Sequence, residues 1–148
     1  MTPMDYFQTF AISRAGMDVE RARVEAAAMN LANANTVLRP GQPGYTPMRV
    51  VAQASRLAAA GPFDHVYESQ SLSGPVAVHE QAAQATRRAY EPQHPAADAE
   101  GFVTYPNVDT TQEMLGLMSA IRAYEANVAA MNAAKTLCLK ALDIGGAA

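Results

Sequence analysis

Both ends of the chain carry hydrophobic residues at helical spacing. In the N-terminal segment, large apolar residues recur at intervals of seven: Phe10, Met17, Val24 and Leu31. This spacing keeps one side of an α-helix apolar and is typical of one half of a coiled-coil contact. No proline interrupts residues 5 to 35, whereas three prolines follow between residues 40 and 47. Since proline disrupts a helix interior, we expect the first helix to end near Thr36.

The C-terminal segment has two interleaved sets of apolar residues at the same spacing. One set is Met114, Ile121, Val128 and Leu142, and the other is Leu117, Tyr124, Met131 and Cys138. Two such sets form the a and d positions of a coiled coil, and only Lys135 breaks the pattern. Thr110 is expected to cap the helix, with Glu113 completing a capping box. We therefore predict a helix from about Thr111 to Ile144 that packs through these side chains.

The middle of the chain follows a different pattern. It holds eight of the nine prolines and short alternating runs that favour strands, namely Met48 to Gln53, Gly74 to Glu80, Thr86 to Tyr90 and Phe102 to Tyr105. Residues 54 to 72 show no persistent period, so we expect a flexible loop. The predicted fold is mainly α with a small β-rich middle, in which long N- and C-terminal helices pair as an antiparallel coiled coil with a β-hairpin insert between them. We expect two domains, 1–36 plus 109–148 and 37–108.

Composition and charge narrow the classes of function. The 148 residues are 49% hydrophobic and carry a net charge of −3, which makes nucleic acid an improbable partner. Polar residues interrupt every apolar stretch well before the roughly 20 residues of a membrane-spanning helix, so we do not expect an integral membrane protein. The first residues also lack the features of a cleaved secretory signal.

Candidate chemistry is sparse along the chain. His65, His79 and His94 lie in separate segments without the close spacing of a zinc site. The lone cysteine, Cys138, lies in an apolar helical stripe and is expected to be a small core residue. Residues 98 to 101 lack the regular oxygen ligands of a calcium loop. We therefore expect no catalytic residue, no metal site, no cofactor and no small-molecule substrate, and we predict that the protein is not an enzyme.

The apolar face of each predicted helix suggests assembly. The face of the first helix is narrow, and the alanine-rich backs of both helices leave apolar surface that one antiparallel pair does not cover. Ordering so long a helix costs backbone entropy, so a lone helix would be marginal. We expect neighbouring copies to cover this surface, and the isolated monomer to have partly disordered termini that fold on assembly.

Three segments carry a resemblance to a known family. Residues 13 to 36, including Asn30, Asn33 and Asn35, resemble the N-terminal signature of the flagellar axial proteins, which form the rod and hook. Residues 90 to 109 look like a segment of the proximal rod members. The C-terminal helix matches the family at five further positions: Arg122, Tyr124, Asn127, Asn132 and Lys135.

The resemblance implies a structural subunit of the periplasmic proximal rod of the bacterial flagellar basal body. Such a subunit is exported by the flagellar type III apparatus without a cleavable signal peptide. It would polymerise through its terminal helices into part of the torque-transmitting drive shaft around the export channel. Its partners would be copies of itself, other flagellar rod proteins and the export apparatus.

Three alternatives remain open from the sequence. The first is another axial protein of the rod. The second is an exported enzyme that uses histidine and acidic side chains of the middle segment. The third is a chaperone-like binding module, which predicts a stable folded monomer.

Overall fold

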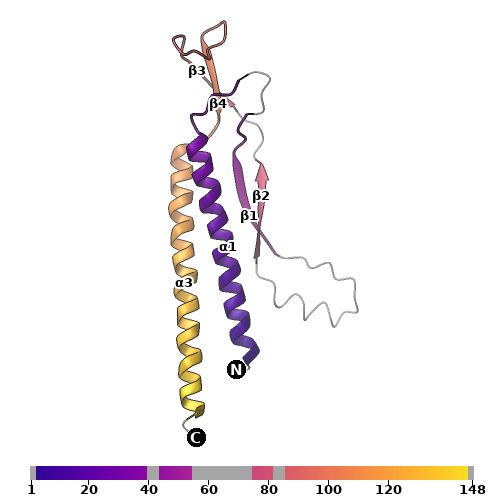
Figure 1. The fold of residues 1–148 in the computed structure, drawn as a ribbon, viewed down its shortest axis with the longest axis vertical. Coiled ribbons are helices and arrows are strands. Elements are labelled where there is room, and N and C mark those ends of the chain that lie inside the picture. The colour runs from indigo at the N-terminus through magenta and orange to yellow at the C-terminus, as the bar shows by residue number, and fades with distance from the viewer. Residues whose placement is uncertain (1–2, 40–43, 55–74, 82–85, 147–148) are drawn as a thin grey trace, which may run out of the picture. The chain divides into compact units, whose positions relative to one another are not determined.

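The computed structural model describes residues 3–39, 44–54, 75–81 and 86–146 (Figure 1). Along the chain, one long helix precedes and another follows a small β-rich middle. In chain order the elements are α1 Pro3–Asn33, β1 Met48–Ala54, β2 Pro75–Gln81, β3 Thr86–Tyr90, β4 Phe102–Pro106 and α3 Thr110–Gly146. This arrangement confirms the predicted fold class. The loop expected at residues 54 to 72 lies, apart from its first residue, outside the described residues.

The chain forms two compact units. We call residues 1–22, 52–78 and 120–148 the terminal unit, and residues 23–51 and 79–119 the central unit. Each helix contributes to both units, as do β1 and β2. The predicted domain boundaries, 1–36 plus 109–148 and 37–108, stay a prediction.

Helix α1 ends close to the predicted position. Its last turn closes with hydrogen bonds from the N–H of Ala34 to the Leu31 carbonyl and from the N–H of Thr36 to the Asn33 carbonyl. The side-chain Nδ2 of Asn33 also donates to the Met29 carbonyl at 2.9 Å. These bonds satisfy carbonyl groups that a helix end otherwise leaves unpaired.

Helix α3 begins with a different cap from the one predicted. Oδ1 of Asp109 accepts the N–H groups of Thr111 and Gln112 at 2.9 and 3.2 Å, so Asp109 is the N-cap residue. The capping box of Thr110 and Glu113 was therefore wrong. The Glu113 side chain turns instead toward Asn30 of α1.

Small residues bring the two helices together in the terminal unit. Ser13, Val19, Ala120 and Ala134 are buried there. A Cβ atom on Gly16 would lie 2.9 Å from Oδ1 of Asn127, a distance that ordinary side chains do not tolerate. The glycine therefore permits the close approach of α1 to α3.

The β-rich middle consists of two sheets of two strands each, β1–β2 and β3–β4. Strands β3 and β4 are antiparallel, with Thr86 opposite Pro106 and Tyr90 opposite Phe102. Along β4, Val103 and Tyr105 are buried, as expected for one face of a strand, and Pro106 at its end is buried as well. The N–H of Leu38 donates to the Thr104 carbonyl at 2.8 Å, which ties the segment after α1 to this sheet.

Cation–π and ion-pair contacts fix the exposed side of the β3–β4 sheet. The guanidinium of Arg88 lies 4.7 Å from the centre of the Phe102 ring and pairs with Asp98 at 2.6 Å. A hydrogen bond from the N–H of Phe102, followed by the Arg88 hydrogen bond, lowers the pKa of Asp98. Gly101 has φ of 84°, and a Cβ atom there would meet the Tyr90 ring at 3.0 Å. Glycine is the residue that fits this turn.

Candidate assembly surface and pocket

The twelve residues predicted to pack along the helices fall into two groups. Eight are half-buried: Phe10, Met17, Val24, Leu31, Leu117, Val128, Met131 and Cys138. The other four, Met114, Ile121, Tyr124 and Leu142, are between 40% and 65% exposed. We call these four residues the outer stripe of α3. Their role in assembly remains a prediction, which the exposure of so many large apolar side chains makes physically reasonable.

A different set of α3 residues is covered within the chain. Ala120 and Ala134 are buried, and Asn127, midway between them, is half-buried against Gly16. These three positions are also seven residues apart, but they precede by one residue the heptad position that holds Ile121, Val128 and Lys135. One residue corresponds to a rotation of about 100° around a helix. Met114 and Ile121 are therefore turned by about 100° from the small-residue side, whereas Leu117, Met131 and Cys138 lie close to that side and are half-buried.

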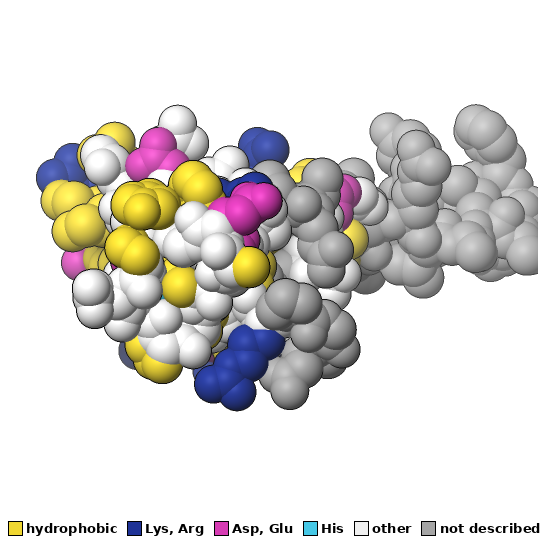
Figure 2. Space-filling view, turned by 90° about the horizontal axis from the view of Figure 1, so that it is seen from above, with side chains coloured by type: hydrophobic (Ala, Val, Ile, Leu, Met, Phe, Trp, Pro, Cys, Tyr) yellow, Lys and Arg dark blue, Asp and Glu magenta, His cyan; other side chains and the backbone are white. Residues whose placement is uncertain are grey.

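Further large apolar side chains are exposed at other positions around α3: Leu115, Met118, Leu137, Leu139 and Ile144. On the face shown in Figure 2, hydrophobic side chains reach the surface among charged and other polar ones. Scattered apolar residues are normal on a surface, whereas a set that runs along one helix marks a contact surface. The outer stripe is therefore the candidate assembly surface, and the other exposed apolar residues extend the apolar surface around α3.

Asn30 organises the central unit. It is 2% exposed. Its Nδ2 donates to the Met48 carbonyl at 2.8 Å and to Oε1 of Glu113 at 2.9 Å. Its Oδ1 accepts the Tyr45 hydroxyl at 2.7 Å and the N–H of Met48 at 2.9 Å. An amide side chain has two donors and two acceptor sites, so Asn30 is fully paired and joins α1, β1 and α3.

Tyr45 shares this cluster. Burial, and to a smaller extent the negative charge of Glu113, raise the pKa of the Tyr45 hydroxyl above its usual value. The phenol therefore stays protonated and remains a donor to Asn30 at physiological pH. Sequence reasoning singled out Asn30 as a family-motif residue but did not identify Tyr45, Met48 or Glu113 as its partners.

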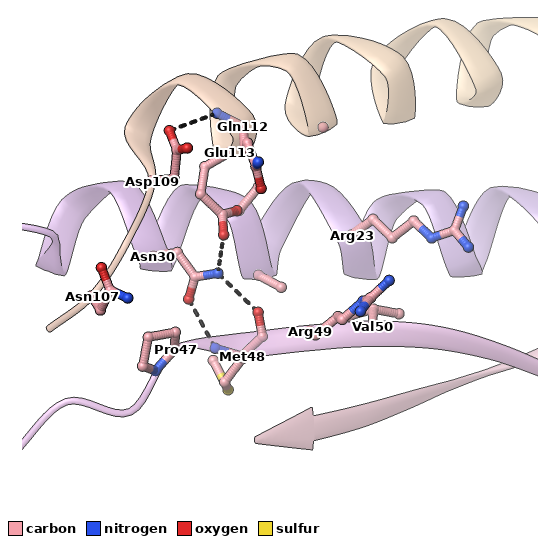
Figure 3. Close-up of a pocket in the computed structure, with 13 residues that line it drawn as sticks. Arg23, Asn30, Pro47, Met48, Arg49, Val50, Asn107, Asp109, Gln112 and Glu113 are labelled. Carbon is pink, nitrogen blue, oxygen red and sulfur yellow. Dashed lines mark hydrogen bonds between the residues drawn. The ribbon is translucent and has the colours of Figure 1, made fainter. Parts of the chain in front are cut away.

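A pocket of about 790 Å³ opens beside the Asn30 cluster in the central unit. Its walls come from α1, from the start of β1 and from the N-terminal turns of α3 (Figure 3). Small and apolar side chains, among them Ala26, Ala27 and Val50, line part of it. In the view of Figure 3, Arg23 and Arg49 lie toward one end and Asp109 toward the other. The pocket thus combines an apolar wall with charges of both signs.

The remaining family-motif residues have different surroundings. Asn33 is half-buried, and Asn35, which is exposed, accepts a hydrogen bond from Arg87 at 2.9 Å. Nδ2 of Asn127 donates to the Ala123 carbonyl at 3.0 Å, which orients its amide toward Gly16. Three more are exposed along α3: Arg122, Asn132 and Lys135. The motif therefore includes residues that hold the fold and residues that face outward.

The histidines are not brought together in the described ranges. His79 is exposed on β2, while His94 is half-buried and its Nδ1 accepts the N–H of Ala96. His65 lies outside the described residues. Within the described part of the chain, no three histidine, cysteine, aspartate or glutamate side chains lie close enough to hold a metal ion. Among the same residues, no helix is long and apolar enough to cross a membrane.

Comparison with known proteins identifies the family. Residues 99–144 match the model described as the C-terminal region of the flagellar basal body rod FlgEFG proteins. The chain is 38% identical to the flagellar basal-body rod protein FlgC of Escherichia coli O6:H1, over 96% of the chain and 99% of that protein. It is 38% identical to FlgC of Salmonella typhimurium and 35% identical to FlgC of Bacillus subtilis, with the same coverage. This similarity along both helices and the β-rich middle confirms the resemblance found in the sequence, and the chain belongs to the FlgC family of flagellar basal-body rod proteins.

Proposed function

We propose that this protein is a structural subunit of the flagellar basal-body rod and polymerises through its terminal helices. Its place is the periplasmic proximal rod, where it forms part of the torque-transmitting shaft around the export channel. Its partners are copies of itself, other rod proteins and the flagellar type III export apparatus, which exports it without a cleavable signal peptide. The family is one of rod proteins rather than enzymes, which argues against the exported enzyme considered from the sequence.

One observation supports this proposal above the others. Helix α3 buries Ala120 and Ala134 and places Asn127 against Gly16 of α1. It leaves Met114, Ile121 and Leu142 between 42% and 65% exposed. A helix that packed only within its own chain would bury those large residues, because they contribute most of the hydrophobic free energy. Their exposure is expected if neighbouring subunits cover them in the assembled rod.

Substitutions on the outer stripe test this function. In a source strain without its own copy of the gene, Met114→Asp and Ile121→Asp should each abolish swimming, because a carboxylate would be placed in a buried apolar contact. The matched control is Ala129→Asp, which adds the same charge at an exposed position of α3. We expect the control to swim normally.

Two measurements show whether a loss of swimming comes from failed assembly or from a lack of protein. Immunoblots of the cells and of purified basal bodies should show normal amounts of both stripe variants in cells and at least tenfold less in basal bodies. Normal amounts of the stripe variants in the basal bodies of swimming cells would contradict assembly through this surface.

The His79→Ala and His94→Ala variants should swim normally, whereas a loss of swimming with intact rods would favour a chemical role for the middle segment.

A further inference from the structure

The C-terminal turns of α3 are unusually apolar for an exposed helix end. We call residues 137–145 the α3 tail. Leu137, Leu139, Leu142 and Ile144 are between 53% and 79% exposed. At about 100° per residue, these side chains are spread around most of the helix. One strip is different, because it carries Lys140 and Asp143, which are three residues apart and therefore lie on the same side.

The pocket of the central unit has the size for such a helix end. A helix about 10 Å in diameter that rises about 1.5 Å per residue occupies roughly 120 Å³ per residue. The pocket, with a volume of about 790 Å³, is therefore large enough to admit part of a helix. In the tail, Leu139, Leu142 and Ile144 fall within about two helical turns.

The charges of the pocket and of the tail are complementary. The pocket carries Arg49 toward one end and Asp109 toward the other (Figure 3). If the tail enters with Asp143 toward Arg49 and Lys140 toward Asp109, opposite charges meet at both ends, whereas the reverse direction brings like charges together. Charged pairs of this kind set the direction and specificity of a contact more than its strength.

The apolar surfaces also match. In the tail, Leu139 and Ile144 flank the strip that carries the charges, since they lie on either side of it in the helical projection. In the pocket, Ala26, Ala27 and Val50 provide small and apolar walls. The leucine and isoleucine side chains would gain burial there, at roughly 1.5 to 3 kcal/mol for each side chain that becomes fully buried.

We propose that the α3 tail of one copy docks in the central-unit pocket of a second copy of this chain. The proposal rests on the proposed function as a rod subunit and names two surfaces that meet. The contact joins different surfaces of identical chains, so it is a head-to-tail contact. Such contacts build open filaments when the rotation between subunits does not close a ring.

A cross-linking experiment with two tagged copies tests the contact. Both copies carry Cys138→Ala, which removes the native cysteine. One copy also carries Asn107→Cys, at an exposed position in the pocket lining, and the other carries Leu142→Cys in the tail. Both are expressed in the source strain without its own gene, and purified basal bodies are treated with a short thiol cross-linker. We expect a product that bears both tags.

The control and the outcomes separate this proposal from the function on which it rests. Ala129→Cys in place of Leu142→Cys should give at least tenfold less of the doubly tagged product. If both copies are present in basal bodies and the tail forms no such product, or links only to another rod protein, the docking proposal is overturned and the rod function stands. Absence of the chain from the basal bodies of swimming cells overturns both.

A charge exchange provides a second readout. Arg49→Glu and Asp143→Arg should each lower the amount of this protein in purified basal bodies by about tenfold. The double variant should recover most of that loss, because it restores an opposite pair in the reversed order. Two single losses without recovery in the double variant would overturn the pairing of the tail with the pocket.

Discussion

Replacing Asn30 by aspartate keeps the shape of the side chain and removes its two donors. The bonds from Asn30 to the Met48 carbonyl and to Glu113 would be lost, at about 1 kcal/mol for the first and about 1.5 to 3 kcal/mol for the second, whose acceptor is charged. A second carboxylate would also lie about 2.9 Å from that of Glu113. At an effective dielectric constant of about 20, that repulsion would reach roughly 6 kcal/mol.

The variant can avoid the repulsion by binding a proton. Keeping a carboxyl group of ordinary pKa near 4 protonated at pH 7 costs about 4 kcal/mol, which limits the electrostatic penalty. Since the bound proton also restores one donor, we expect Asn30→Asp to lower the free energy of unfolding by about 3 to 5 kcal/mol at pH 7.

The pH dependence of this loss has a definite sign. In the folded variant the pair of carboxyl groups shares a proton, so its pKa is raised above the value in the unfolded chain. Its contribution to stability is therefore fully present below the unfolded pKa of about 4 and is lost as the pH rises through the folded pKa. We expect the destabilisation to fall to about 1 kcal/mol near pH 4.

Urea titrations followed by circular dichroism, with hydrogen exchange at residues 44 to 51 as a local readout, would measure this change. The matched control is Asn33→Asp, because among the described residues the Asn33 side chain bonds to Met29 in its own helix turn and to Thr36 just after it. We expect the control to cost about 1 kcal/mol or less at either pH. A loss of unfolding free energy in Asn30→Asp no greater than in the control, or no recovery of stability at low pH, would contradict this expectation.

Two further predictions concern the helices. Gly16→Leu should lower the free energy of unfolding by about 1 to 3 kcal/mol through overpacking against Asn127. The control Gly116→Ala places its new Cβ in open space and should raise the free energy of unfolding by up to about 1 kcal/mol. Equal effects of the two substitutions in urea titrations would argue against close packing at Gly16. Asp109→Ala should cost about 1 kcal/mol through loss of the cap. Thr110→Ala should cost less, and the reverse order in thermal melts would restore the predicted capping box.

The sequence predicted the elements well because their signals are local. Helix α1 ends before the prolines that follow residue 39, and the alternating run at Thr86–Tyr90 matches β3 residue for residue. Helix α3, predicted to end at Ile144, continues through Gly145 to Gly146. The sequence did not determine which residue caps the N-terminus of α3. Asp109 followed three residues later by Gln112 satisfies the same motif as Thr110 followed by Glu113, so the sequence alone offered two starts one residue apart.

The packing of α3 was harder to predict for a physical reason. Hydrophobic periodicity finds the side that carries large apolar residues, and it gives little weight to alanine, glycine and asparagine. Within this chain those small residues form the contact, as Gly16 against Asn127 shows. The Asn30 cluster was out of reach because it joins Asn30 to Glu113, 83 positions away, and the sequence carries no sign of which distant partners a buried amide will find.

The central claim is that the outer stripe of α3 is covered by neighbouring subunits in the rod. Electron cryomicroscopy of basal bodies from the source bacterium, at a resolution that shows side chains, tests it most directly. Our account predicts that this chain lies in the rod with Met114, Ile121, Tyr124 and Leu142 buried against other subunits. A rod in which these four side chains face solvent, or one that lacks this chain, would contradict the account.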